Sequence, residues 1–478
     1  MFHNLFMPLT GAGGSWIGQT SRMSAEPAEI DRTVLDEMVS AQAEQHHCPT
    51  ISWGVVRNGA LELSGAVGDV SEHTVYRIAS MTKSFSAAAT LLLRDDGAFR
   101  LDDPIGRLVP ELASLRSPTT DTAAITLRDL LSMTSGFVTD DAWADRHLDL
   151  TDDEFDAIIA SGPVFAEPTG TTYEYSNFGY AVLGRVVHRV TGHRIQHHIT
   201  ERLLEPLGMQ STSWVMPDHD DWARPMRWLD DRHGDELAPL DDGLIAPMGG
   251  LWTTVTDLAS WIAWLDDAYP ARDGTDGGPL QRSSRRELQT SQQYVGMRSY
   301  GDHRYPTSYC LGHRVLHEPQ RGPIVSHSGG FPGYGSNMSW RLGRRLGVIA
   351  LSNTTYAPMT ELGIRMLEQV SSQVDPPPHQ RPVPTRLALT ADRLVRLLNS
   401  WDDVTADALF ADNVEPDDSW QRRRAVADRY RPLDITTVTA LNDARARIEC
   451  TTAAARTTAI TFALAPHDPA KIQDYDIE

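Results

Sequence analysis

Ser80 and Lys83 are the pair of residues in this chain whose types and spacing best fit reaction chemistry. They are three residues apart at the start of a predicted helix over residues 80–96, so their side chains share one face. A buried, neutral lysine amine accepts the proton of a serine hydroxyl, and the helix N-terminus favours the negative charge that develops during attack. The chain has only two lysines, Lys83 and Lys471, and its other basic side chains are arginine. The pair predicts a nucleophilic serine with a lysine as its base.

Two further short patterns supply the partners that such a nucleophile needs. Tyr175-Ser176-Asn177 lies in a Gly/Thr-rich loop before a predicted helix, where a phenol relays protons and an amide holds a substrate carbonyl. His327-Ser328-Gly329-Gly330 ends a predicted strand, whose edge pairs with an extended acyl chain and whose last N–H faces an oxyanion. Each pattern is common by chance. The prediction depends on their chain order and on the elements that carry them.

Several longer segments carry a family resemblance over roughly residues 30–370. They are ITLRDLLSMTSG (125–136), PTGTTYEYSNFGYAVLGRVVHRVTG (168–192), EPLGM (205–209), GGLWTTVTDLASW (249–261) and HSGGFPGYGS (327–336). Together with the three short patterns, they resemble the penicillin-recognising serine hydrolases. This family includes class C β-lactamases, D-alanyl-D-alanine carboxypeptidases, D-aminopeptidases and β-lactamase-like esterases. The segments are specific for the family and say little about the substrate.

The resemblance implies a role for each short pattern. Ser80 is expected to be the nucleophile, Lys83 its base and Tyr175 the proton relay to the leaving group. Substrate binding is expected from Asn177, His327, Ser328 and Gly329, and the oxyanion hole from the backbone N–H groups of Ser80 and Gly330. The resemblance implies no metal and no cofactor.

Two positions depart from common forms of the family. Many β-lactamases have Lys-Thr-Gly where this chain has His327-Ser328-Gly329, so a fixed ammonium is missing and a mostly neutral histidine binds a carboxylate less strongly. This favours ester, amide or peptide substrates over efficient β-lactam hydrolysis. Met133 stands where the family often has histidine before Thr-Ser-Gly, and we expect it to pack.

We therefore expect a serine hydrolase that acts through a covalent acyl-enzyme on small esters, amides or D-configured peptides. Two alternatives stay open. An intracellular acyl transferase or peptide cyclase would use the same acyl-enzyme, and a non-catalytic acyl-binding or sensor protein would keep the cavity without turnover. The presence of both Lys83 and Tyr175 argues against the sensor.

The elements that must position these residues follow from the apolar pattern. A β-hairpin is predicted from strands over 51–57 and 60–70, joined by Asn58-Gly59. Helices are predicted over 80–96, 179–191 and 255–266, and strands over 324–328, 336–342 and 346–352. With the resemblance, this gives an α/β fold of the β-lactamase/transpeptidase type. An antiparallel sheet is flanked by helices, a helical subdomain is inserted between its strands, and the site lies in the cleft between them.

Composition shifts divide the chain into four parts. Residues 1–29 are expected to be a flexible tail, and residues 30–373 the hydrolase domain. The segment VDPPPHQRPVP predicts a stiff linker over 374–385. Beyond it, helices over 388–401 and 420–429 and strands over 435–441, 444–452 and 457–464 predict a small α+β accessory domain over 386–478. No function follows for that domain.

Charge and cysteine content exclude several classes of partner. Sixty-four acidic against 43 basic residues give a net charge of −21, which repels nucleic acid and anionic lipid. No apolar run approaches the length needed to span a bilayer. The three cysteines fit neither a disulfide framework nor a zinc site, and the N-terminus lacks a secretory layout, so we expect a cytoplasmic protein. Its partner is a small-molecule or peptide substrate. The oligomeric state and the true start, Met1 or Met23, stay open.

Overall fold

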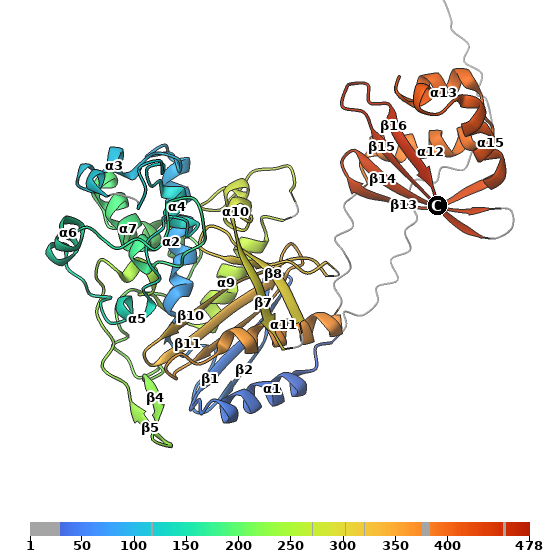
Figure 1. The fold of residues 1–478 in the computed structure, drawn as a ribbon. Helices are drawn as coiled ribbons and strands as arrows, with labels where there is room; N and C mark the ends of the chain where they lie inside the picture. The colour runs from blue at the N-terminus through green and yellow to red at the C-terminus, as the bar shows by residue number, and fades with distance from the viewer. Residues whose placement is uncertain are drawn as a thin grey trace, which may run out of the picture. The chain divides into compact units, whose positions relative to one another are not determined.

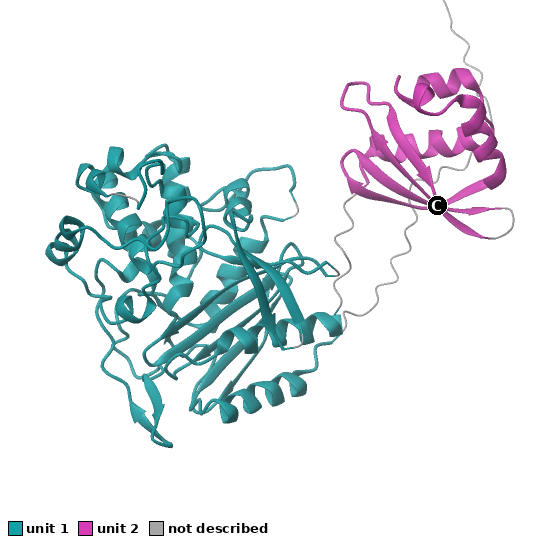
Figure 2. Cartoon of the chain, viewed as in Figure 1, with its two compact units in different colours: residues 1–375 teal, residues 376–478 magenta. Residues whose placement is uncertain are grey.

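The computed structural model describes residues 29–115, 118–269, 271–301, 303–319, 321–374, 383–452 and 456–478. The chain divides into two compact units, Met1–Asp375 and Pro376–Glu478 (Figure 2). All but the last residue of the predicted tail, and most of the predicted proline-rich linker, lie outside the described residues.

An eight-stranded antiparallel sheet forms the centre of the first unit (Figure 1). Its spatial order is β2-β1-β12-β11-β10-β9-β8-β7, so the first hairpin pairs with the last strand of the sheet in the sequence. The strands are β1 Ile51–Arg57, β2 Ala60–Val67, β7 Gln293–Tyr300, β8 His303–Tyr309, β9 Arg314–Leu316, β10 Ile324–Phe331, β11 Tyr334–Arg341 and β12 Leu346–Ser352. Asn58 and Gly59 both have positive φ, as the predicted two-residue turn requires.

The sheet is covered on both faces, and β12 shows this directly. Val348 and Ala350 belong to one apolar core, with α1 (Arg32–Gln45) and α11 (Met359–Val374). Ile349 and Leu351, which point the other way, belong to a second core that includes α9 (Val255–Asp266). A strand buried on both faces is apolar throughout, as this one is.

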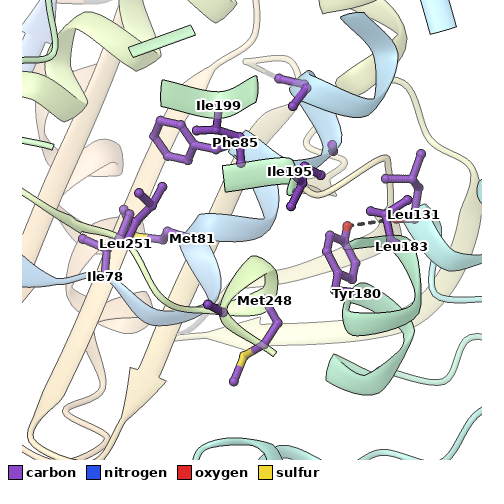
Figure 3. Close-up of a cluster of buried hydrophobic side chains, with 14 of the residues drawn as sticks. Ile78, Met81, Phe85, Leu131, Tyr180, Leu183, Ile195, Ile199, Met248 and Leu251 are labelled. Atoms are coloured by element: carbon purple, nitrogen blue, oxygen red, sulfur yellow. Dashed lines mark hydrogen bonds between the residues drawn. The ribbon is translucent and has the colours of Figure 1, made fainter. Parts of the chain in front are cut away.

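A helical subdomain is inserted between β2 and β7. Its central helices are α2 (Thr82–Asp95) and α7 (Asn177–Thr191), and apolar side chains such as Phe85, Leu183 and Ile199 fill the space around α2 (Figure 3). The other helices of the first unit are α3 Ile105–Leu108, α4 Leu127–Leu131, α5 Asp141–Ala144, α6 Asp152–Ser161, α8 Ile195–Ile199 and α10 Arg282–Leu288. Short turns are η1 Ala79–Met81, η2 Pro110–Ser114, η3 Thr200–Leu204 and η4 Ala246–Met248. Two small sheets pair β3 Tyr76–Arg77 with β6 Trp252–Thr253, and β4 Met226–Leu229 with β5 Arg232–Asp235.

The second unit is a four-stranded antiparallel meander with helices and its own apolar core. Its elements are α12 Thr385–Asn399, α13 Asp403–Leu409, α14 Val414–Asp417, α15 Trp420–Tyr430, β13 Leu433–Asn442, β14 Arg445–Thr452, β15 Thr457–Leu464 and β16 Ile472–Ile477. The predicted fold class, an antiparallel sheet flanked by helices with a small C-terminal α+β unit, is confirmed. In neither unit do the described helices include one long and apolar enough to cross a bilayer.

Candidate active site

Ser80 lies in the turn η1, directly before α2 rather than inside it. The preceding residue, Ala79, has φ +48°, a left-handed conformation that L-residues adopt only at a cost of about 1–3 kcal/mol. Strand β10 holds this turn closely, because a Cβ on Gly329 would lie 2.2 Å from the carbonyl oxygen of Ile78. On β11, Ser336 Oγ donates to that same oxygen at 2.8 Å. Gly329 therefore permits the close approach that fixes the position of Ser80.

Lys83 is fully buried on the first turn of α2, with three polar atoms around its amine. Its Nζ lies 3.1 Å from Ser80 Oγ, 2.7 Å from Asn177 Oδ1 and 2.9 Å from the carbonyl oxygen of Met248. Burial lowers the pKa of Lys83 to about 7, against the opposing effect of nearby aspartates. A neutral amine has two N–H donors and one lone pair. Because the amide and carbonyl oxygens only accept, the lone pair of neutral Lys83 faces the Ser80 hydroxyl.

Asn177 begins α7 and connects Lys83 to a group of aspartates. Since its Oδ1 accepts from Lys83, its Nδ2 faces Asp141 Oδ1, to which it donates at 2.7 Å. Asp140 accepts from the backbone N–H groups of Asn177 and Phe178 at 2.7 and 2.8 Å, which satisfies two free donors of the helix start. Burial raises the pKa of Asp140. The structure thus uses both ends of the Asn177 amide to hold Lys83 in place.

Tyr175 stands beside Lys83, with its ring centroid 4.9 Å from Nζ. Burial, with the charge of Asp141 next in effect, raises the pKa of Tyr175 well above its ordinary value, so the phenol keeps its proton at neutral pH. Met133 holds this loop. Its carbonyl oxygen accepts from Glu174 N at 2.9 Å and its Sδ from Ser176 N at 3.4 Å. Met133 is buried in the core, as a packing residue is, and also orients the tyrosine loop.

His327 is neutral and bound within the protein. Its Nδ1 lies 2.8 Å from the carbonyl oxygen of Ser328, which only accepts, so Nδ1 carries the proton and Nε2 accepts from Tyr309 at 3.2 Å. Burial, followed by the charges of Lys83 and Arg314, lowers the pKa of His327 well below its ordinary value. His327 therefore supplies no positive charge for a substrate carboxylate.

Ser328 offers a hydrogen-bond donor to the cavity. Its Oγ accepts from Asn337 Nδ2 at 2.9 Å and from Thr360 Oγ1 at 2.6 Å. With both acceptor sites of the hydroxyl filled by described residues, its own hydrogen is available to a group that enters the cavity.

A cavity of about 600 Å³ brings most of the predicted residues together. Ser80, Tyr175 and the strand from His327 to Gly330 line it. Lys83 and Asn177 do not line it, because both are fully buried behind Ser80. Its remaining lining residues were not predicted from the sequence and include Thr139, Asp141, Asp145, Tyr173, Glu174, Arg298, Ser326, Arg314, Tyr356 and Thr360.

Arg314 is the most informative of the residues that sequence analysis missed. It lies on the three-residue strand β9, paired in register with Ser326 of β10, and its Nη2 donates to Tyr173 OH at 3.1 Å. Its Cζ lies 5.7 Å from the Tyr175 ring centroid. Its guanidinium and that of Arg298 bring positive charge to the cavity lining, where His327 is neutral. No local pattern distinguishes Arg314 from the other arginines, so only the strand pairing reveals it.

Comparison with known proteins identifies the family. Residues 35–371 match the Beta-lactamase family model, so the chain belongs to the beta-lactamase family, as the sequence motifs predicted. Members of this family are generally serine hydrolases.

Two curated relatives are each 29% identical to this chain. One is Protein flp of Staphylococcus aureus (strain MW2), over 248 residues, which are 48% of this chain and 47% of that protein. The other is Beta-lactamase-like protein 2 of Dictyostelium discoideum, over 207 residues, which are 42% of this chain and 37% of that protein. The chain thus spans less than half the length of the curated relatives it matches.

Two solved structures share the fold. The octameric penicillin-binding protein homologue from Pyrococcus abyssi has a TM-score of 0.62 at 19% identity, and the match covers 94% of this chain and 100% of that one. The D-stereospecific amidohydrolase from Streptomyces sp. has a TM-score of 0.57 at 21% identity, with coverage of 72% and 98%. At these identities the likeness concerns the fold alone.

Proposed function

We propose that the protein is a serine hydrolase that forms an acyl-enzyme on Ser80 and acts on small amides, esters or D-configured peptides. The observation that carries this proposal is the geometry of Lys83. Its other two hydrogen-bond partners only accept, and burial lowers its pKa to about 7, so its lone pair faces Ser80 at 3.1 Å. This geometry supports Ser80 as the nucleophile and Lys83 as its base.

In the proposed reaction, Lys83 and Tyr175 each act once in the acylation of Ser80 and once in its deacylation. Lys83 takes the Ser80 proton as Oγ bonds to the substrate carbonyl carbon, and the backbone N–H groups of Ser80 and Gly330 stabilise the oxyanion. Such a donor contributes about 3 kcal/mol in known cases. The carbonyl–leaving-group bond then breaks as Tyr175 gives its proton to the leaving group, and the proton on Lys83 restores the phenol. Water repeats the sequence in reverse and releases the acid.

The presence of both positive and negative side chains in the cavity lining favours a short peptide as substrate. Arg314 lies beside Tyr175 and can bind a carboxylate on the leaving group. Asp141 and Glu174 also line the cavity and can bind an amine of the substrate. One of the similar structures is a D-stereospecific amidohydrolase, so D-configured dipeptides and amides are the substrates to test first.

Intact-protein mass spectrometry after incubation with a fluorophosphonate, and separately with a penicillin, tests the nucleophile. We expect one fluorophosphonate adduct, lost in Ser80→Ala and kept in Ser161→Ala, whose serine lies at the end of α6 away from the cavity. Absence of an adduct on folded wild-type protein would overturn the proposal and favour the sensor. A stable penicilloyl adduct would place the substrate among D-alanyl peptides.

Turnover assays then define the reaction. We expect hydrolysis of D-alanyl dipeptides or D-alanine amide over their L-enantiomers, with loss in Ser80→Ala. Product analysis with an added D-amino acid separates hydrolysis from acyl transfer, since a transferase would form the new amide.

The buried, unpaired thiols of Cys48, Cys310 and Cys450 support the proposed cytoplasmic location.

A further inference from the structure

Tyr356 joins the two walls of the cavity. It lies between β12 and α11, on the sheet side, and its hydroxyl donates to Asp145 Oδ2 at 2.9 Å. Asp145 directly follows α5 of the helical subdomain and is buried. Tyr356 is half exposed and has φ +52°, a conformation that is costly for an aromatic residue. The backbone and the hydroxyl thus hold this ring across one end of the cavity.

The ring also packs against the strand that faces Ser80. A Cβ on Gly330 would lie 2.9 Å from Tyr356 Cδ1, so a side chain at that position would displace the ring. The backbone N–H of Tyr356 donates to Phe331 O at 3.3 Å. Gly330 is the residue whose own N–H is the proposed oxyanion donor, so the Tyr356 ring lies close to the reacting carbonyl.

A second cavity of about 410 Å³ lies on the other side of this ring. Both cavities are lined by Tyr356, Ala357 and Pro358, which therefore form the partition between them. The second cavity is also lined by the β4–β5 hairpin, which projects beyond the sheet in Figure 1 and contributes Trp228 and Leu229. Trp228 is held in place by stacking on His47 at 3.9 Å between ring centroids, and Leu229 is half exposed. The remaining lining residues are polar or charged (His46, Arg227, Glu236, Thr354 and Thr355), so Trp228 and Leu229 form the apolar part of this second cavity.

Strand β10 determines which part of a substrate faces Tyr356. Arg314 pairs with Ser326, and its guanidinium lies by Tyr175, the proposed proton donor to the leaving group. Gly330 is four residues further along the strand, about 13 Å away at the usual rise. With the leaving group at the Ser326 end, the acyl group lies at the Gly330 end and meets the Tyr356 ring.

We propose that Tyr356 is a specificity-determining residue that limits the length of the acyl group by closing the second cavity to it. The inference rests on the proposed function, since it concerns the acyl side of the same site. Without the ring, the two cavities become continuous and an unbranched apolar acyl chain reaches Trp228 and Leu229.

The test compares kcat/KM for p-nitrophenyl esters from acetate to octanoate. Wild type is expected to prefer acetate. Tyr356→Ala is expected to raise the octanoate-to-acetate ratio at least about tenfold, because each buried methylene favours binding several-fold. Tyr356→Phe keeps the ring and should keep the wild-type profile. Tyr294→Ala is the matched control, because Tyr294 is similarly exposed but lies on β7 outside both cavities.

Two further variants keep the result decisive. Tyr356→Gly suits the positive φ and serves if the alanine variant does not fold. Leu229→Trp added to Tyr356→Ala refills the second cavity and should cancel the gain. An unchanged chain-length profile in folded Tyr356 variants whose Ser80 still reacts with a fluorophosphonate would overturn this inference alone. A wild-type protein with neither a Ser80 adduct nor turnover would overturn the proposed function, and this inference with it.

Discussion

The polar atoms behind Ser80 and those in front of it are satisfied in different ways. Behind it, Lys83 and Asn177 are fully buried, and each makes short hydrogen bonds within the protein. In front, Ser328 keeps a hydroxyl hydrogen available, and Arg314 faces the cavity with a tyrosine hydroxyl as its partner. The comparison teaches that the proposed bond-making groups are held by hydrogen bonds within the fold, whereas the groups proposed to meet the substrate keep part of their bonding capacity.

The largest effect is expected when the buried amine of Lys83 is removed. Lys83→Met deletes the base and leaves the oxygens of Asn177 and Met248 without their donor. We expect kcat/KM for p-nitrophenyl acetate to fall about 10³- to 10⁴-fold. Steady-state kinetics with circular dichroism to verify folding measure it. Lys471→Met, at the other lysine of the chain, should change nothing, and a loss below tenfold in folded Lys83→Met would exclude Lys83 as the base.

Removing the charge in front of Ser80 should act on selected substrates only. In Arg314→Met we expect kcat/KM for D-alanyl dipeptides with a free carboxylate to fall about 10- to 100-fold, because a charge-assisted hydrogen bond is lost. Amides without the carboxylate should be nearly unaffected. Arg365→Met, an exposed arginine on α11 outside the cavity, is the control. An equal loss on both substrate types would show that Arg314 supports the fold of the site instead.

The pH dependence sharpens the difference between the two sides. Because the pKa of Lys83 is lowered to about 7, its neutral fraction and the rate of Ser80 acylation should rise about tenfold between pH 6 and pH 8. Unfolded lysine keeps its proton up to a higher pH than the folded group. The contribution of Lys83 to the free energy of unfolding is therefore smallest below pH 7 and grows as the pH rises towards the ordinary lysine pKa. A flat rate profile of fluorophosphonate labelling would contradict the assignment.

The smallest effect is expected from the hydroxyl that orients Ser328. Thr360→Val removes a donor to Ser328 Oγ, so that hydroxyl gains rotational freedom. We expect KM to rise a few-fold with kcat nearly unchanged, in line with the loss of one neutral hydrogen bond. Thr385→Val, on the first turn of α12 in the second unit, is the control. A large fall in kcat would instead show that Thr360 on α11 also helps to position the groups buried behind Ser80.

The parts of the fold predicted from the sequence are those with local causes. Asn58-Gly59 forms the predicted turn because of its backbone preference, and the helix before Gly97 ends at Asp95, one residue before its predicted end. Helix α1 and the strands β7 and β8 were not predicted. Much of β7 is exposed at the edge of the sheet, so its residues lack a clear alternation. Strand β9 has only three residues and no pattern of its own.

The candidate site divides in the same way. Ser80, Lys83, Tyr175 and Asn177 stand in recognisable short motifs. Arg314 reaches the cavity through strand pairing, and Tyr356 through a positive φ. Neither cause can be recognised from the local sequence. The hydrogen bonds of the Asn177 amide to Lys83 and to Asp141 likewise depend on residues far apart in the chain.

The scarcity of lysine has a consequence for the acyl-enzyme chemistry proposed for Ser80. Apart from Lys83 and Lys471, no side chain of this chain offers a primary amine, and Lys83 is wholly covered. Arginine guanidinium groups do not take up acyl groups under ordinary conditions because they stay protonated. The first unit therefore exposes no lysine amine to stray acylation by the proposed substrates. Peptide mapping after amine modification would compare the buried amine of Lys83 with the amine of Lys471 in the same chain. Modification of Lys83 would report directly on transient exposure of the groups buried behind Ser80.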